Sequence, residues 1–203
     1  MMLRSQKQLS YTIGPFTEMS LNSMIAAAAE GDLGEKTRGQ SSNPVWMKER
    51  SFRLTASHFG EVCKQRKSTN PFNLVLRILK SQFKGSSGAS FDGIIDADMI
   101  IEVKCPYSAN KYSPEDAVNK KKIKYVELNE EENKVKLKKN CNYYYQVQGQ
   151  LAIANAKICY FIVWTPLGIA VEEIEQDDFW TNVMLPKLKS FYLDQMLPEI
   201  VEE

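Results

Sequence analysis

Apolar side chains recur at two different spacings along the chain, and each spacing predicts a type of element. Over residues 71–83 they stand three and four positions apart, which is typical of an amphipathic helix. The same spacing predicts helices over about 142–155 and 177–195. The last of these has six apolar residues available for burial: Phe179, Val183, Leu185, Leu188, Phe191 and Leu193.

Strands are expected where short apolar runs are bounded by turn residues. Such runs occur in four places: 91–106, 123–138, 157–164 and 169–174. The first is expected to turn at 96–98 and the second at 129–133, so that each forms a hairpin. The order of helices, strands, helix, strands and helix predicts an α/β domain with a mixed central sheet flanked by helices.

The N-terminal part of the chain has a weaker pattern. Residues 1–43 are rich in Ser, Gly, Asn and Ala and are expected to form a weakly ordered arm, followed by a domain over 44–203. Near the start of that domain Ser57 could cap a short helix beginning at His58, with Glu61 near the third position of a capping box.

The first hairpin brings charged residues together. If its turn is centred on Ala97, paired residues have numbers that sum to 194, and Asp92 lies opposite Glu102. Side chains paired in this way have Cβ atoms about 4.5–5.5 Å apart, a separation suited to sharing one metal ion. Alternation places Lys104 on the face of Glu102 and Val103 on the opposite, packed side.

This set of side chains fits metal-dependent phosphate chemistry. Two carboxylates hold a hard cation such as Mg²⁺ or Mn²⁺, which polarises a phosphate and lowers the pKa of a bound water. A lysine orients that water and offsets the developing negative charge. The same residues also fit an exposed hairpin with an incidental Glu–Lys pair, because the spacing E-x-K alone is very common.

Composition narrows the choice of chemistry. The chain has 203 residues, 43% of them hydrophobic and 25% charged, an ordinary balance for a globular domain. It has one histidine and four cysteines without C-x-x-C spacing, which argues against zinc sites and redox motifs. No apolar run approaches the roughly 20 residues needed to cross a bilayer, and the N-terminus lacks a signal-peptide pattern. An intracellular location is expected, without a distinction between nucleus and cytoplasm.

Positive charge is concentrated although the net charge is only +1. Between Glu61 and Asp92 there is no acidic residue, while six basic ones occur: Lys64, Arg66, Lys67, Arg77, Lys80 and Lys84. A second group comprises Lys120, Lys121, Lys122 and Lys124. Each group could contact phosphates or could form a solvated face.

Four segments carry a family resemblance. They are VWMKERSFRLTASHFGEV (45–62), SFDG (90–93), IIEVKCP (100–106) and YYYQVQGQL (143–151). In combination they resemble the phage lambda exonuclease and YqaJ-like viral recombinase family, part of the PD-(D/E)XK nuclease superfamily. The resemblance implies a restriction-endonuclease-like fold and exonuclease digestion of double-stranded DNA, linked to recombination. It also suggests a single-strand annealing recombinase as a partner, allows a homo-oligomer, and implies no membrane.

The resemblance assigns roles to individual residues. Asp92 and Glu102 are similar to the metal-binding carboxylates, and Lys104 to the catalytic lysine. Val103 would lend its carbonyl to the metal, and Gln146 matches a glutamine beside the site.

Further residues are assigned to DNA or left open. The DNA contacts are Arg50 and Ser57, with Lys64, Arg66 and Lys67 from the basic run. The alternative for Ser57 is a plain helix cap without a DNA contact. Gln148 lies about 200° around the helix from Gln146, so both cannot face the metal, and Gln148 is expected at the surface.

Two departures from the family pattern stand out. Phe91 replaces a proline that lies outside the chemistry. More seriously, a Gly-x-x-x-Glu helix and a strand are missing at about 83–89, and residues 62–91 contain no acidic residue. We therefore expect only two side-chain carboxylates at the metal, an open sheet edge, and apolar surface near Phe83 and Phe91. The alternatives to a nuclease are a catalytically impaired DNA-binding remnant and a structural or interaction protein.

Overall fold

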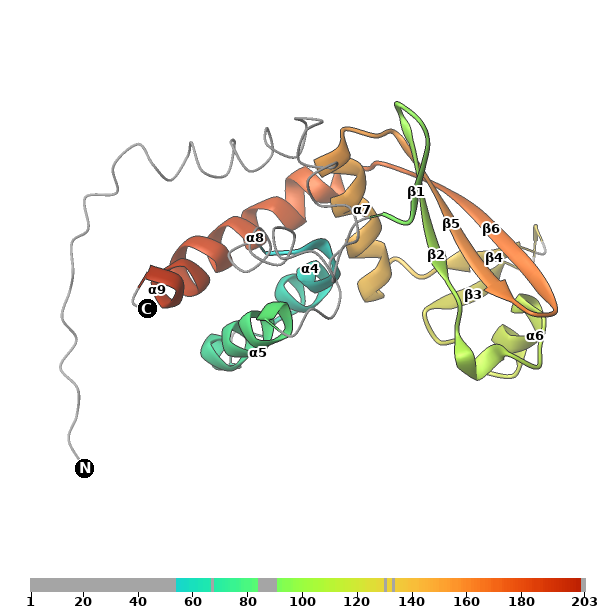
Figure 1. Cartoon of the computed structure of the whole chain (residues 1–203), viewed down its shortest axis with the longest axis horizontal. Coiled ribbons are helices and arrows are strands. Elements are labelled where there is room, and N and C mark those ends of the chain that lie inside the picture. Colours follow the sequence, from blue (N-terminus) through green and yellow to red (C-terminus); the bar gives the residue numbers. More distant parts are fainter. Residues whose placement is uncertain (1–53, 67, 84–90, 130, 133, 202–203) are drawn as a thin grey trace.

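The computed structural model describes residues 54–66, 68–83, 91–129, 131–132 and 134–201. Its elements fall into two groups on either side of one helix, α7 (Asn142–Ala154). Strands lie on one side and the remaining long helices on the other (Figure 1). The expected arm, residues 1–43, lies outside the described part, as does the segment 84–90.

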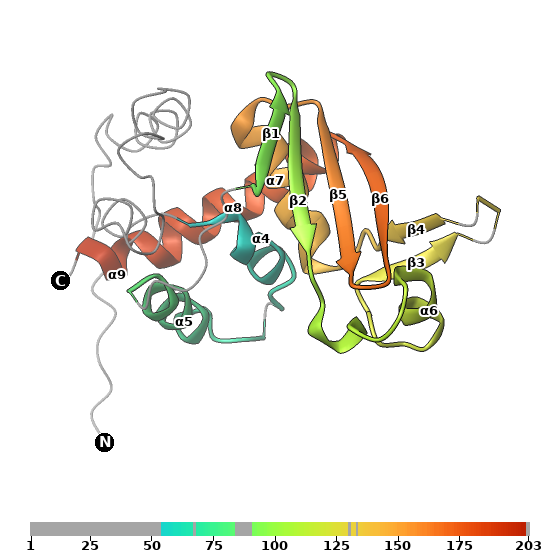
Figure 2. The ribbon, with the colours of Figure 1, turned by 45° about the vertical axis from the view of Figure 1, so that its right-hand side comes forward.

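The main sheet has four strands in the order β1-β2-β5-β6, side by side in Figure 2. Their bounds are Gly93–Asp96, Met99–Lys104, Ile158–Thr165 and Gly168–Glu175. β2 runs parallel to β5, and the β1–β2 and β5–β6 pairs are antiparallel. The predicted mixed sheet flanked by helices is therefore confirmed.

A small second sheet packs beside the first. It consists of β3 (Val126–Asn129) and β4 (Lys134–Leu137), and it is the second hairpin expected from the sequence. β4 contacts β6, where the backbone N–H of Leu137 donates to the Glu172 carboxylate. The preceding segment forms a short 3₁₀ turn, Tyr107–Ala109, and the helix α6 (Pro114–Asn119), neither of which the apolar pattern predicted.

The helical side consists of α4, α5 and a long C-terminal helical stretch. α5 spans Pro71–Phe83, the bounds that its apolar spacing predicted. The C-terminal stretch runs from Trp180 to Val201, beyond the expected end at 195, and alternates π-helical and α-helical turns: η3 (Trp180–Met184), α8 (Leu185–Phe191), η4 (Tyr192–Met196) and α9 (Leu197–Val201). Of the six apolar residues expected to be available there, Leu188 and Phe191 are buried, together with Met184, Tyr192 and Met196.

The start of α4 corrects one prediction. α4 spans Ala56–Cys63, so its N-cap is Thr55, and Ser57 is the second helical residue instead of the cap. The backbone N–H of His58 donates to the Thr55 carbonyl at 2.9 Å, and the helix begins two residues earlier than expected. Glu61 does not close a capping box, because its carboxylate pairs with Arg77 of α5.

Two apolar cores share α7 as their common wall. On the sheet side Val147 and Leu151 of α7 join β2, β5 and the small sheet. On the helical side Tyr145 and Ile153 pack against a core formed by α4, α5 and the C-terminal stretch. α4 and α7 approach closely at Gly149, where a Cβ atom would lie 2.4 Å from the Phe59 ring.

Candidate active site

The first hairpin adopts the expected register over most of its length. Gly93 pairs with Ile101 and Ile94 with Ile100, both sums being 194, and the register shifts by one at the turn. Asp92 continues this ladder just before β1. Its backbone N–H donates to the Ile101 carbonyl at 2.8 Å, and its carboxylate accepts from the Val103 N–H at 2.7 Å. Asp92 thus bonds to the residues on both sides of Glu102.

The Glu102 carboxylate is buried, with 2% of the residue exposed. One oxygen, Oε1, accepts from the Lys104 ammonium and from Nε2 of Gln146 at 2.9 Å. The other, Oε2, accepts from Nε2 of Gln150 at 2.8 Å. An isolated buried carboxylate would be very costly, so these three donors are what allow the charge to stay in the interior.

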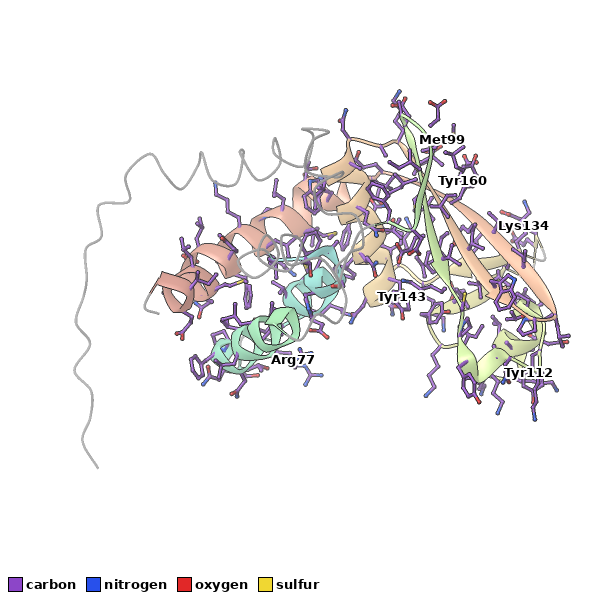
Figure 3. The ribbon with its side chains drawn as sticks, viewed as in Figure 1. Arg77, Met99, Tyr112, Lys134, Tyr143 and Tyr160 are labelled. Carbon is purple, nitrogen blue, oxygen red and sulfur yellow. The ribbon has the colours of Figure 1, made fainter. Side chains whose placement is uncertain are left out.

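Lys104 lies on the same face of β2 as Glu102, as the strand alternation predicted. Its ammonium is also 4.5 Å from the ring centroid of Tyr143, which comes from the first turn of α7 (Figure 3). The contact with an aromatic face adds a cation–π interaction to the ion pair. Lys104 is therefore held between the strand and the helix.

The covered face of β2 is not the one that was predicted. Val103 was expected on the packed side, but Ile100 and Glu102 are the buried residues, and Val103 is only half-buried. α7 covers the Glu102 face, and two of its glutamines supply donors that make burial of the carboxylate tolerable. Beyond Glu102, Cys159 of β5 is also buried, and burial raises the pKa of its thiol to about 12, so it stays protonated.

The three glutamines of α7 divide between two faces. Gln146 and Gln150 are four residues apart and both reach Glu102. Gln148 points the other way, as its angular position predicted: it donates to the Glu175 carbonyl at 2.8 Å and accepts from the Asp177 N–H at 3.0 Å. Gln148 is fully buried, so its expected surface position is wrong. Gln150 was missed, although its i+4 spacing from Gln146 predicts a shared face.

The ligand types at this site fit a hard divalent cation. Asp92 and Glu102 offer carboxylate oxygens, and Oε1 of Gln150 is a buried oxygen without a hydrogen-bond partner among the described residues. A third acid is not close: within the described ranges no group of three or more His, Cys, Asp or Glu residues lies together. Asp98, at the hairpin turn, instead pairs with Lys157 at 2.6 Å.

The expected DNA contacts are partly described. Ser57 is half-buried, and its hydroxyl lies 3.1 Å from that of Thr55. Lys64 donates to the Asn140 carbonyl at 3.3 Å, just ahead of α7, and lies 5.5 Å from the Tyr145 ring centroid. Arg66 is exposed. Arg50 and Lys67 lie outside the described residues.

Comparison with known proteins identifies the fold. No protein-family model matches the chain, and no curated protein matches its sequence. A crystal structure of an alkaline exonuclease, LHK-Exo from Laribacter hongkongensis, is similar with a TM-score of 0.53 at 17% identity, over 77% of this chain and 94% of that one. A second structure of LHK-Exo, in complex with dAMP, has a TM-score of 0.53 at 16% identity, over the same shares.

At this identity the likeness establishes the mixed α/β fold of an alkaline exonuclease. Among the described residues no helix has the length and apolar character needed to span a membrane.

Proposed function

We propose that the chain is a metal-dependent deoxyribonuclease of the PD-(D/E)XK type that hydrolyses phosphodiester bonds of double-stranded DNA from its ends. The observation that supports this best is the buried Glu102, which pairs with Lys104, while Asp92 bonds to the backbone of its two neighbours. A buried charge of this kind has no purpose in packing, because apolar residues would fill the place at less cost. Its setting in an alkaline exonuclease fold makes nucleic-acid hydrolysis the most economical explanation.

In this proposal Asp92, Glu102 and the carbonyl of Val103 would hold Mg²⁺ or Mn²⁺. The ion, when bound, supplies Lewis-acid polarisation of the phosphate and a water of lowered pKa. Gln146 and Gln150 fix the orientation of the Glu102 carboxylate through their amide groups. Lys104 places a cation beside the reacting phosphate, where it offsets negative charge in the transition state.

The proposed substrate track uses the basic residues at the start of the domain. Arg50, Ser57, Lys64, Arg66 and Lys67 would contact DNA phosphates, which gives affinity without base sequence preference. A role in viral-type recombination, a single-strand annealing recombinase as partner and a homo-oligomeric state belong to the same proposal. An intracellular location accords with a DNA substrate.

A second candidate is a catalytically impaired, DNA-binding form of the same fold. It is favoured by the acidic residues at the site, where Asp92 and Glu102 have no third acid beside them among the described residues. Hard divalent ions take about six oxygen ligands, so water would have to complete the shell and affinity for the ion would drop. Such a protein would keep salt-dependent DNA binding and lose cleavage.

The test is incubation with end-labelled duplex DNA, with Mg²⁺, with Mn²⁺ and with EDTA. We expect shortening of the labelled strand only with a divalent ion, and a loss of about 10²–10³-fold or more in Glu102→Gln. Glu173→Gln, at an exposed position of β6, is the matched control and should cleave like the parent chain. Salt-dependent DNA binding without cleavage under any ion would favour the impaired form over the nuclease. If the chain neither binds nor cleaves DNA, both candidate functions are wrong.

A further inference from the structure

A pocket of about 470 Å³ lies on the helical side, between the end of α4 and the first turns of α5. Its lining includes Lys64, Gln65 and Arg66 from the segment after α4, and Asn73 and Arg77 from α5. Pockets of a few hundred Å³ with a few convergent polar groups are the usual sites of small ligands or of single ligand groups. All the described lining residues except Leu74 are polar or charged, which points to an occupant with polar groups.

The charges of the pocket favour an anion. The one acid among the described lining residues, Glu61, accepts two hydrogen bonds from the Arg77 guanidinium, at 3.0 and 2.7 Å. Burial alone would raise the pKa of Glu61, but the pair with Arg77 outweighs burial and leaves that pKa lowered, so Glu61 stays ionised. Among the described residues the Lys64 ammonium donates to a neutral carbonyl and pairs with no acid. Lys64 and Arg66 therefore leave positive charge uncompensated in the lining.

One amide in the lining lacks an acceptor. Nε2 of Gln65 is buried and has no hydrogen-bond partner among the described residues. Leaving a buried donor unsatisfied costs about 1–3 kcal/mol, so such a group is rarely kept without an occupant that satisfies it. An anionic oxygen in the pocket would be attracted by Lys64 and Arg66, and a rotation of the Gln65 side chain would turn this amide toward it.

We propose that this pocket binds the phosphate ester of a nucleotide, either a phosphodiester of the DNA backbone or the phosphate of a free mononucleotide. The identity of the ligand as a nucleotide rests on the proposed nuclease function, whereas the binding of phosphate rests on the pocket itself. The site is separate from Ser57. Ser57 lies in the first turn of α4, the pocket lies at the end of that helix, and the two ends are about 10 Å apart. Arg77, which pairs with Glu61, lines the pocket from α5, the helix on which Figure 3 labels it.

The experiment measures binding in EDTA, so that cleavage plays no part. Three single variants are compared with the parent chain: Gln65→Leu, Arg66→Gln and, as a matched control of charge, Lys189→Gln on the exposed side of α8. Fluorescence anisotropy with a short labelled duplex gives one dissociation constant. Thermal unfolding with and without dAMP gives the stabilisation by a free nucleotide.

Loss of a hydrogen bond to a charged group corresponds to about tenfold in affinity, so Arg66→Gln should weaken binding by about that factor. Gln65→Leu should unfold at the same or a higher temperature than the parent without ligand, because it removes an unsatisfied buried donor, and should show a smaller shift with ligand. Lys189→Gln should stay within about twofold of the parent.

The two arms separate the sources of the phosphate. A defect with the duplex alone assigns the pocket to the DNA backbone, and a defect with dAMP alone assigns it to a free nucleotide. The proposal is overturned if both ligands bind Arg66→Gln and Gln65→Leu as they bind the parent, or if Gln65→Leu lowers the unfolding temperature without ligand. A chain that cleaves DNA but shows either result retains the nuclease function and loses only the pocket.

Discussion

The two sides of α7 differ in where their polar side chains lie: several are buried on the sheet side, whereas those of the helical side are mostly exposed. All five buried polar residues of the described part belong to α7 or to the main sheet: Glu102, Gln146, Gln148, Gln150 and Thr165. The core of the helical side is built from apolar residues, and Cys63 and Tyr192 are its only buried residues with a polar side-chain atom other than methionine sulfur. Charged groups of that side, such as Arg77 and Lys64, are exposed.

This difference separates a site that is built into the interior from one that is displayed at the surface. On the sheet side a carboxylate is held at the expense of stability, because its burial requires three donors in fixed places. On the helical side cations cost little, since water solvates them, and they can be added or lost without disturbing the core. The first arrangement suits chemistry on a bond, and the second suits binding of a charged strand.

The largest expected effect is on the sheet side, when one ion pair is broken on each side and the losses of stability are compared. Lys104→Met leaves the Glu102 carboxylate buried without its cation and should lower the free energy of unfolding by about 3–5 kcal/mol. Arg77→Met breaks an exposed pair with Glu61 and should lower it by about 1 kcal/mol at most. Urea denaturation of both variants gives the two values.

The double variant Glu102→Gln with Lys104→Met is the control for this experiment. It removes both charges and should recover most of the loss, because no unpaired carboxylate remains in the interior. Equal losses for Lys104→Met and Arg77→Met would mean that the two sides do not differ in the way that their burial indicates.

Much of the sheet side was predictable because its signals are local. The turn near Ala97 fixes the hairpin register, and strand alternation then places Lys104 beside Glu102. On the helical side, the local spacing of apolar residues likewise predicted both ends of α5. Each of these inferences depends on residues that are close together in the sequence.

The errors lie where distant segments decide the outcome. β2 has apolar residues on both faces, so alternation does not tell which face is covered, and Glu102 is buried only because Gln146 and Gln150 arrive 44 and 48 residues later. Gln148 was expected at the surface, but it is buried because the end of β6 brings Glu175 to it and the following segment brings Asp177. The pocket after α4 arises from the packing of α5 and has no local signature.

A smaller effect is expected at the contact between the two sides. Gly149→Ala puts a Cβ atom against the Phe59 ring at 2.4 Å, so α4 and α7 must separate. Such overpacking costs about 1–3 kcal/mol, which thermal or urea unfolding would measure. Combining Gly149→Ala with Phe59→Leu should cost less than the sum of the two changes, because the smaller side chain makes room. Additive losses would show that the ring is not what excludes the methyl group.

The smallest expected effect is the pH dependence of stability that one acid from each side contributes. Burial raises the pKa of Glu172 on β6, and the pair with Arg77 leaves the pKa of Glu61 on α4 lowered. A raised folded-state pKa gives stability that is present at low pH and lost as pH rises through that pKa. A lowered one gives stability that is present above the unfolded-state pKa and lost as pH falls.

Replacement of these acids by glutamine should therefore have opposite signs at pH 7. Glu172→Gln should raise the unfolding temperature by about 2 °C, since Leu137 keeps an oxygen acceptor and the unfavourable charge is gone. Glu61→Gln should lower it by a similar amount, because Arg77 loses its partner. Both differences should shrink as the pH is lowered through the range where carboxyl groups protonate. Thermal unfolding at several pH values measures this convergence. Equal signs at neutral pH would contradict the view that Glu172 is held against the cost of burial, whereas the pair with Arg77 more than offsets that cost at Glu61.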